Sequence, residues 1–237
     1  MQPSTRWCAG RARTADRSSS WRGVIPVLER DGYEVIAVAN PLLGLGSDSQ
    51  YVADVVKSIH APVVLVGHSY GGAVISGAGV GAEHVKALVY VAGFAPDAGE
   101  SALALSAKFP GSTLGTALAP PVVLASGDKD FYIQQAKFHE QFAADVPARE
   151  AAAMAAGQRP VSEAALNEAA HEPAWKSIPS WFIYGDQDRN IPPQVLAFMA
   201  ERARSKGTEV VRGGSHAVMV SNPVAVAHMI ERAATHE

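Results

Sequence analysis

The chain has 237 residues, 48% of them hydrophobic and 18% charged, which is compatible with one large α/β domain and a sizeable core. The formal net charge is −3 and the composition gives no sign of a basic face, so a nucleic-acid partner is not expected. No apolar run reaches the roughly 18 residues that span a bilayer, so we expect a cytoplasmic protein without a membrane partner.

Residues 1–18 are predicted to be an irregular N-terminal segment. They carry Arg6, Arg11, Arg13 and Arg17 among Ser, Thr and Ala, and they contain no strand-like apolar run. They also lack the hydrophobic stretch of a secretory signal. Two alternatives remain open: an organelle transit peptide, which is also rich in Arg and Ser, and a first strand lost through a shifted reading frame or a wrong start.

From residue 19 to 237 the chain alternates between strand and helix patterns. The predicted strands are Glu34–Val38, Val63–Val66, Val85–Val91, Pro179–Tyr184 and Thr208–Arg212. The predicted helices begin near Trp21, Ser47, Gly72, Pro193 and Pro223. This alternation predicts an α/β fold with a mainly parallel sheet and helices on both faces.

The interval from about residue 94 to 177 breaks the alternation, with weak strands and Ala-rich helices. Phe138, Phe142 and Val146 recur four residues apart, so one helix there has an apolar face. One interpretation is simple packing onto the sheet domain. The other is a mostly helical cap inserted over an active site, and the two are compatible.

The segment Gly67–Gly71 matches the motif G-x-S-x-G and lies between a predicted strand and a predicted helix. In that setting the serine, Ser69, is held on a strained turn with its hydroxyl exposed above the sheet edge. The flanking glycines are expected because a Cβ there would collide with the neighbouring strand or helix. A chance match is the alternative, but the strand before and the helix after favour a nucleophile.

A serine hydroxyl needs a base, and in this arrangement the chain order is Ser, then an acid, then His. His216 follows two glycines after the predicted strand that ends at Arg212, and we predict it as the base. Asp188 is predicted as the acid that orients the imidazole, with Asp186 as the alternative.

A second acidic motif, Gly127–Asp130, also follows an apolar run. It precedes the cap helices and lacks the Ile-Pro that follows Asp188 closely, so we interpret it as a turn in the cap. The single cysteine, Cys8, and the scattered histidines offer no clustered metal ligands, so we expect neither a metal nor another cofactor.

The expected oxyanion hole and substrate pocket surround this triad. The backbone N–H of Tyr70 is the predicted first oxyanion donor. The pocket is predicted to be lined by His68, Phe131, Tyr132 and Phe138, which would shape an acyl or aryl site.

Taken together, these motifs resemble the α/β-hydrolase superfamily, and more narrowly its small cofactor-free branch of plant hydroxynitrile lyases, methyl salicylate-type esterases and bacterial relatives. The resemblance covers roughly residue 19 to the C-terminus. It rests on residues 67–72, 94–97, 179–193 and 215–223. It implies the α/β-hydrolase fold and hydrolysis of a small carboxylic ester.

Two positions depart from the family pattern. Ala217 stands where the lyases carry a lysine, which argues against cyanohydrin cleavage by that route. Residues 12–14 stand where relatives have His-Gly and an oxyanion residue, so the second oxyanion donor is missing or is supplied near Thr14. The abrupt change at Ser19 leads to the hypothesis that residues 1–18 are a frame-shifted or mis-started version of the first strand, which is then missing or altered, leaving the protein less stable and less active.

The favoured function is a serine hydrolase of the carboxylesterase type that cleaves a small apolar ester through Ser69, His216 and Asp188 and an acyl-enzyme. One alternative is a weakened or non-hydrolytic relative that binds a small molecule. Another is a cofactor-free haloperoxidase or C–C hydrolase on the same triad, since one fold supports several chemistries. The sequence gives no signal for an oligomeric state.

Overall fold

Runs of Val, Ile and Leu form the strands of a parallel sheet. The computed structural model describes residues 6–10, by their backbone, and residues 20–236. The strands of the large sheet are β1 (Arg6–Gly10), β2 (Glu34–Val38), β3 (Val63–His68), β4 (Val85–Val91), β8 (Ser180–Gly185) and β9 (Gly207–Val211). Within the described residues this sheet has six strands in the order β2-β1-β3-β4-β8-β9, and all pairs are parallel. The predicted α/β class is therefore confirmed.

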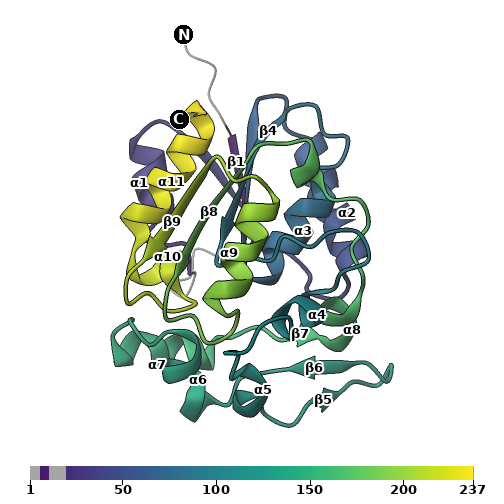
Figure 1. The fold of residues 1–237 in the computed structure, drawn as a ribbon, viewed down its shortest axis with the longest axis vertical. Coiled ribbons are helices and arrows are strands. Elements are labelled where there is room, and N and C mark those ends of the chain that lie inside the picture. Colours follow the sequence, from purple (N-terminus) through teal and green to yellow (C-terminus); the bar gives the residue numbers. More distant parts are fainter. Residues whose placement is uncertain (1–5, 11–19, 237) are drawn as a thin grey trace.

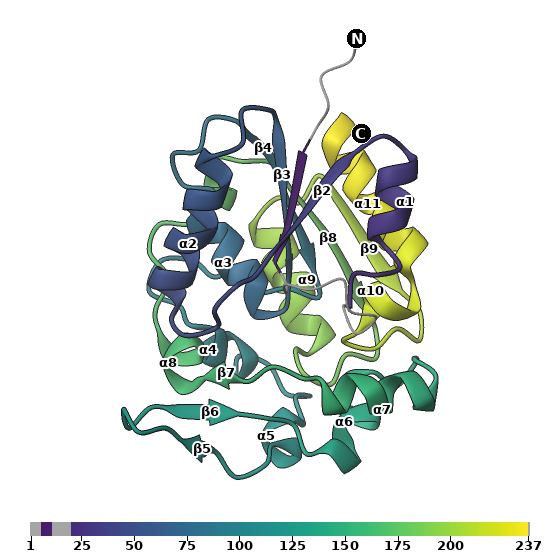
Figure 2. The ribbon, with the colours of Figure 1, turned by 180° about the vertical axis from the view of Figure 1, so that it is seen from behind.

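Helices cover both faces of this sheet (Figures 1 and 2). On one face lie α1 (Ile25–Arg30) and α11 (Pro223–Thr235), and on the other α2 (Leu45–Lys57), α3 (Tyr70–Ala78) and α9 (Pro193–Arg202), while the short α10 (Val218–Ser221) precedes α11. The helix predicted near Ser47 begins earlier, at Leu45. Ser47 donates its hydroxyl to the Gly44 carbonyl, and Gly44 takes the N-cap position in an extended conformation.

The first strand is a correction to the sequence prediction. Residues 1–18 were expected to be irregular, with the first strand missing or altered, but residues 6–10 form β1 between β2 and β3. Cys8 pairs with Ile36 on one side and with Leu65 on the other. Hydrogen bonding to two neighbours stabilises an extended backbone even where the local sequence lacks a strand pattern, because tertiary context overrides weak local propensity.

Between β4 and β8 the chain builds the cap, which has helices and a small second sheet. Its helical elements are α4 (Ala102–Ser106), α5 (Leu114–Ala117), α6 (Gln135–Phe142), α7 (Ala148–Ala156), α8 (Glu163–Asn167) and the 3₁₀ helix η1 (Ala174–Lys176). Its strands are β5 (Val122–Val123), β6 (Lys129–Phe131) and β7 (Val161–Ser162), paired antiparallel. The segment Gly127–Asp130 spans the β5–β6 turn and the start of β6. It was predicted to be a turn in the cap, and it lies there.

The cap lies across the carboxyl ends of the parallel strands (Figures 1 and 2). A small apolar cluster that includes Ile133, Phe138 and Val146 holds α5, α6 and α7 together, and Ala217 from the sheet domain packs into it. In parallel α/β sheets, ligands bind outside the carboxyl ends of the strands, so the cap and this edge enclose the expected site.

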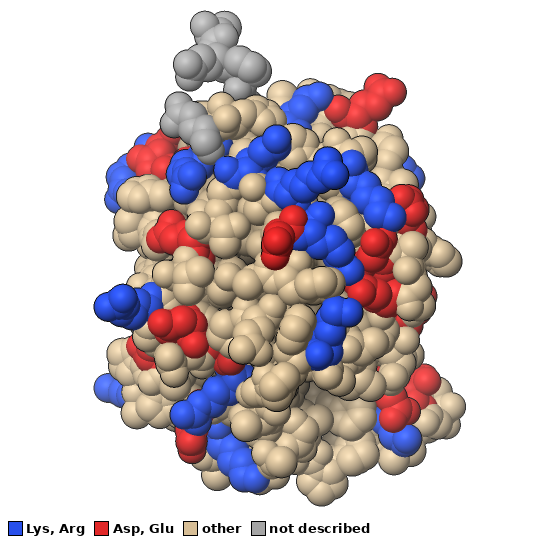
Figure 3. All heavy atoms as spheres, in the orientation of Figure 1, with Lys and Arg blue, Asp and Glu red and all other residues tan. Residues whose placement is uncertain are grey.

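The surface carries charges of both signs. On the face shown in Figure 3, Lys and Arg are interspersed with Asp and Glu. Across residues 6–10 and 20–236, we find no helix with the length and apolarity that crossing a membrane requires. The same residues contain no group of three or more His, Cys, Asp or Glu side chains arranged to hold a metal ion.

Candidate active site

Ser69 sits on the sharp turn between β3 and α3. Its backbone has φ 54° and ψ −126°, a region that residues with a Cβ rarely occupy. Its N–H donates to the carbonyls of Val91, at 3.3 Å, and Ala92, at 3.1 Å, at the end of β4. Its carbonyl accepts from the N–H groups of Gly72 and Phe94, both at 3.0 Å. Four backbone hydrogen bonds therefore hold the strained turn in place.

Two glycines let this turn pack closely against its neighbours. A Cβ on Gly67 would overlap the Gly71 carbonyl, and one on Gly72 would overlap the Phe94 carbonyl. Gly71 differs from the expectation, because a Cβ there would meet nothing within 4 Å. The close approach therefore requires glycine at positions 67 and 72, and not at the final position of the G-x-S-x-G motif.

The structure brings Asp188 and His216 together. His216 Nδ1 lies 2.7 Å from Asp188 Oδ2, and both side chains are fully buried. The other carboxylate oxygen of Asp188 accepts from the N–H groups of Asn190, at 2.8 Å, and Ile191, at 2.9 Å. Because a carboxylate only accepts, Nδ1 carries a proton, and in the neutral imidazole this tautomer has its accepting lone pair on Nε2.

The His216 ring is enclosed by two other rings. Its centroid lies 4.7 Å from that of His68 and 4.9 Å from that of Phe142. His68 Nε2 donates to the His216 carbonyl at 3.0 Å. This hydrogen bond links the G-x-S-x-G motif directly to the loop after β9 that carries His216, the histidine loop. Among the described residues, Nε2 of His216 has no hydrogen-bond partner, and none joins it to Ser69. Such hydrogen bonds are often long without a substrate and tighten in the complex.

The alternative acid and the two predicted oxyanion donors lie at separate positions around the triad or outside the described residues. Asp186 accepts from the Gly213 N–H at 2.7 Å and so stabilises the loop before His216 instead of facing the imidazole. Tyr70 is the first residue of α3, where backbone N–H groups have no acceptor within the helix and the helix dipole favours negative charge. Thr14 lies outside the described residues.

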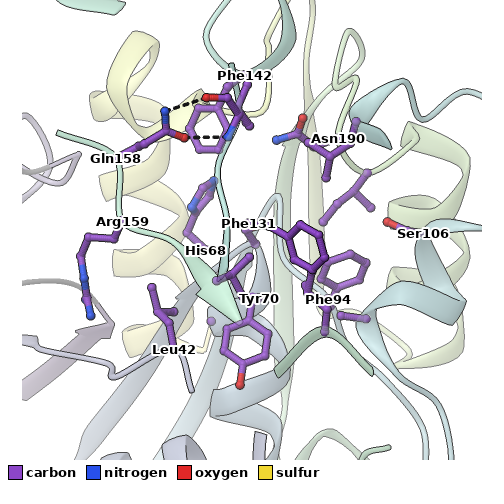
Figure 4. Close-up of a pocket in the computed structure, with 18 of the residues that line it drawn as sticks. Leu42, His68, Tyr70, Phe94, Ser106, Phe131, Phe142, Gln158, Arg159 and Asn190 are labelled. Carbon is purple, nitrogen blue, oxygen red and sulfur yellow. Dashed lines mark hydrogen bonds between the residues drawn. The ribbon is translucent and has the colours of Figure 1, made fainter. Parts of the chain in front are cut away.

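A cavity of about 220 Å³ opens beside Ser69. Three of the four predicted pocket residues, His68, Phe131 and Phe138, line it, and Figure 4 shows His68 and Phe131 facing each other across it. Tyr132 does not line it, because successive side chains of an extended segment point in opposite directions and Phe131 takes the inward one. Most of the wall is apolar, with Leu42, Phe94, Leu103, Leu114, Leu118, Ile133, Phe142, Met154, Val161, Leu166 and Ile191.

Sequence reasoning missed an acidic residue beneath the turn. Asp48 of α2 is fully buried, and it accepts from the Tyr70 hydroxyl at 3.0 Å and from the Leu43 N–H at 3.3 Å. Burial raises the pKa of the Asp48 carboxyl despite these hydrogen bonds. Burial, and then the nearby Asp48 charge, raise the pKa of the Tyr70 hydroxyl, which stays protonated and donates. No local pattern reveals this pair, because its members lie 22 residues apart.

Comparison with known proteins places this geometry in a family. Residues 8–229 match the alpha/beta hydrolase family. The chain belongs to that family. Among curated members, it is 27% identical to the alpha/beta hydrolase nvfD of Aspergillus novofumigatus (strain IBT 16806), and the match covers 92% of each protein. This confirms the superfamily that the motifs resemble.

Solved structures agree on the fold of this alpha/beta hydrolase. Polyneuridine aldehyde esterase superposes with a TM-score of 0.79 at 17% identity, covering 97% of this chain and 99% of that one. A pyrethroid hydrolase from Sphingobium faniae JZ-2 gives 0.73 at 20% identity, covering 98% and 97%. The methylesterase MES16 from Arabidopsis gives 0.74 at 15% identity, covering 98% and 99%.

Proposed function

We propose that this alpha/beta hydrolase is a serine esterase that cleaves a small, largely apolar carboxylic ester without a cofactor. The observation that carries the proposal is the strained Ser69 turn at the wall of an apolar cavity, where the neighbouring His68 ring lies 4.7 Å from the ring of His216 in a buried Asp188–His216 pair. The esterases among the similar folds, together with the family match, support the same reaction class.

In this proposal Ser69 Oγ attacks the ester carbonyl and its proton moves to His216 Nε2. The tetrahedral intermediate collapses, the alcohol leaves with that proton, and the acyl group stays on Ser69. Water then attacks the acyl-enzyme, giving its proton to Nε2, and the acid leaves as Ser69 recovers its proton. Asp188 keeps the ring in the tautomer that accepts at Nε2 and stabilises the imidazolium.

The developing oxyanion needs preorganised donors. The Tyr70 N–H at the start of α3 is the proposed first donor, and one such donor contributes about 3 kcal/mol to lowering the barrier. The cavity favours a small substrate, since 220 Å³ lies below the usual range for drug-sized ligands. Its mainly apolar wall favours an apolar acyl or alkyl group.

The first test is labelling with a fluorophosphonate probe, followed by intact-mass analysis. We expect stoichiometric labelling of the wild-type protein and none of Ser69→Ala, because only an activated serine attacks the phosphorus. A panel of 4-nitrophenyl esters should then show turnover that falls by at least about 10³-fold in Ser69→Ala.

A folded wild-type protein that takes up no label and hydrolyses no ester would contradict the proposal. Ligand binding in the same cavity, without reaction at Ser69, would then become the better account of this chain. Asn167→Leu, at an exposed position on α8, is the control and should label like the wild type.

A further inference from the structure

Asn190 is a buried amide that forms part of the cavity wall. It follows Asp188 by two residues and is only 4% exposed. Its backbone N–H is used by the Asp188 carboxylate, but its side chain takes no part in the proposed Ser69 chemistry. A polar side chain at this depth is expected to have hydrogen-bond partners for each of its atoms.

The orientation of the Asn190 amide is fixed on its cap side by Gln141. Thr113 donates its hydroxyl to Gln141 Oε1 at 2.8 Å. Gln141 Nε2 then uses its two protons on Asn190 Oδ1 and on the Arg189 carbonyl, both at 2.8 Å. The Arg189 carbonyl can only accept, so the Gln141 atom that faces it is the amide nitrogen, and the Asn190 atom that accepts from the same nitrogen is Oδ1.

The Asn190 amino group, Nδ2, is therefore left on the cavity side. Within residues 6–10 and 20–236 it has no hydrogen-bond partner. Figure 4 shows the amide at the edge of the cavity with its nitrogen turned toward the side on which His68 lies. Two N–H protons with no acceptor in a mostly apolar site are unfavourable until a ligand or water supplies an oxygen.

Two other polar side chains on the cavity wall, those of Gln158 and Arg159, already have hydrogen-bond partners. Gln158 makes a reciprocal pair with the backbone of Ile133, at 2.9 and 2.8 Å (Figure 4). Arg159 donates to the carbonyls of Asn40, at 2.8 Å, and Pro41, at 3.3 Å. Asn190 differs from these two side chains because its donor is oriented by Gln141 and has no acceptor among the described residues.

We propose that Asn190 is a specificity residue, whose Nδ2 donates to a neutral ether or carbonyl oxygen that the ester carries in addition to its scissile group. The inference rests on the proposed esterase function and names a substrate class for it: small esters that are mainly apolar but carry one further acceptor oxygen.

The test compares four 4-nitrophenyl esters of equal chain length. One is the hexanoate, and in the others an ether oxygen replaces a methylene: the propoxyacetate, the 3-ethoxypropanoate and the 4-methoxybutanoate. The ratio of kcat/KM for each ether ester to that for the hexanoate is measured in the wild type, in Asn190→Leu and in the control Asn167→Leu. Comparing ratios between variants cancels the intrinsic reactivity of each ester.

For at least one ether position, we expect the ratio to fall about 3- to 10-fold in Asn190→Leu and to stay unchanged in the control, as for loss of one net hydrogen bond. Unchanged ratios at all three positions in a folded Asn190→Leu would overturn the proposal, while hydrolysis of the hexanoate would leave the esterase function standing.

A second measurement works without turnover and without altering Asn190. Binding of the four esters to Ser69→Ala is followed by calorimetry. The proposal expects one ether ester to bind at least as tightly as the hexanoate, although the ether is better hydrated in water. Weaker binding of all three ether esters would overturn it. Preferential ether binding by a protein whose wild type hydrolyses nothing would instead reject only the esterase function.

Discussion

Ser69 occupies a backbone conformation that is unfavourable for any residue with a Cβ, by about 1–3 kcal/mol. The surrounding chain stabilises it through the end of β4, whose carbonyls at Val91 and Ala92 accept the Ser69 N–H. Ala92 itself has a positive φ of 41°. The chain therefore leaves both β3 and β4 through a residue with positive φ, and these two residues are hydrogen-bonded to each other. At the residue scale, the position of the hydroxyl therefore depends on backbone packing more than on contacts of the serine side chain.

The two glycines after Tyr70 provide a matched test of this packing. In Gly72→Ala the new Cβ meets the Phe94 backbone, so we expect a loss of about 1–3 kcal/mol of stability and slower fluorophosphonate labelling as Ser69 shifts. Gly71→Ala adds a methyl group into open space within α3, where Ala is favoured over Gly by up to about 1 kcal/mol.

Thermal melts of the two glycine variants test whether the close approach to Phe94 is what requires glycine at position 72. The midpoint of Gly71→Ala should equal or exceed that of the wild type, and that of Gly72→Ala should fall below it. Equal losses in both variants would mean that the glycines matter for backbone freedom and not for the close approach to Phe94.

At the scale of elements, α2 and α3 are joined by the buried hydrogen bond from Tyr70 to Asp48. Burial raises the pKa of Asp48 in the folded protein above its ordinary value near 3.8. Between these two pKa values the folded state binds more protons than the unfolded state, so the Asp48 contribution to stability falls as pH rises through this window.

Asp48→Asn removes this titration and tests it. The free energy of unfolding of the wild type minus that of Asp48→Asn should decrease as pH is raised from about 4 toward neutrality, measured by urea unfolding at each pH. This difference in the free energy of unfolding isolates Asp48, because every other carboxylate titrates in both proteins. A difference that grows with pH over this range would contradict a raised pKa for Asp48.

Local patterns were sufficient for some elements and not for others. Strands β3 and β4 are continuous runs rich in Val and Leu, and α11 has apolar residues at helical spacing. These patterns are local, so the three elements were predicted from the sequence. Ser69, Asp188 and His216 were selected because each stands at a recognisable turn after a strand. Asn190 and Gln141 could not be paired in advance, since their contact joins residues 49 apart in the chain. The direction of Tyr132 likewise depended on the register of β6 in the cap sheet.

At the scale of the whole molecule, the cap contacts the loop that carries His216, and the chain after β4 is paired with α9. Phe142 at the end of α6 accepts from the Ala217 N–H at 3.0 Å, next to His216. Arg202 of α9 makes a two-pronged ion pair with Glu100 at 2.9 and 2.8 Å. Although Glu100 is partly buried, Arg202 lowers the pKa of its carboxyl. The cap therefore positions the histidine loop as well as closing the cavity.

The central place of β1 has the largest consequence for the molecule, because a strand between two others supports both halves of the sheet. Cys8 stands in the middle of β1, opposite Ile36 and Leu65. A proline there removes a backbone donor and cannot be accommodated in a central strand. We expect Cys8→Pro to lower Tm by at least about 6 °C, roughly 2 kcal/mol for a chain of this size, and Cys8→Ala to lower it much less.

The proline and alanine variants separate two accounts of the N-terminal segment. If β1 is part of the folded sheet, Cys8→Pro weakens the whole cooperative unit, and fluorophosphonate labelling of Ser69 is lost at the same temperature as the fold, because β3 carries the nucleophile turn and pairs directly with β1. If the two variants instead melt and label alike, residues 6–10 contribute nothing to the sheet. In that case β2 would lack the strand partner that β1 provides.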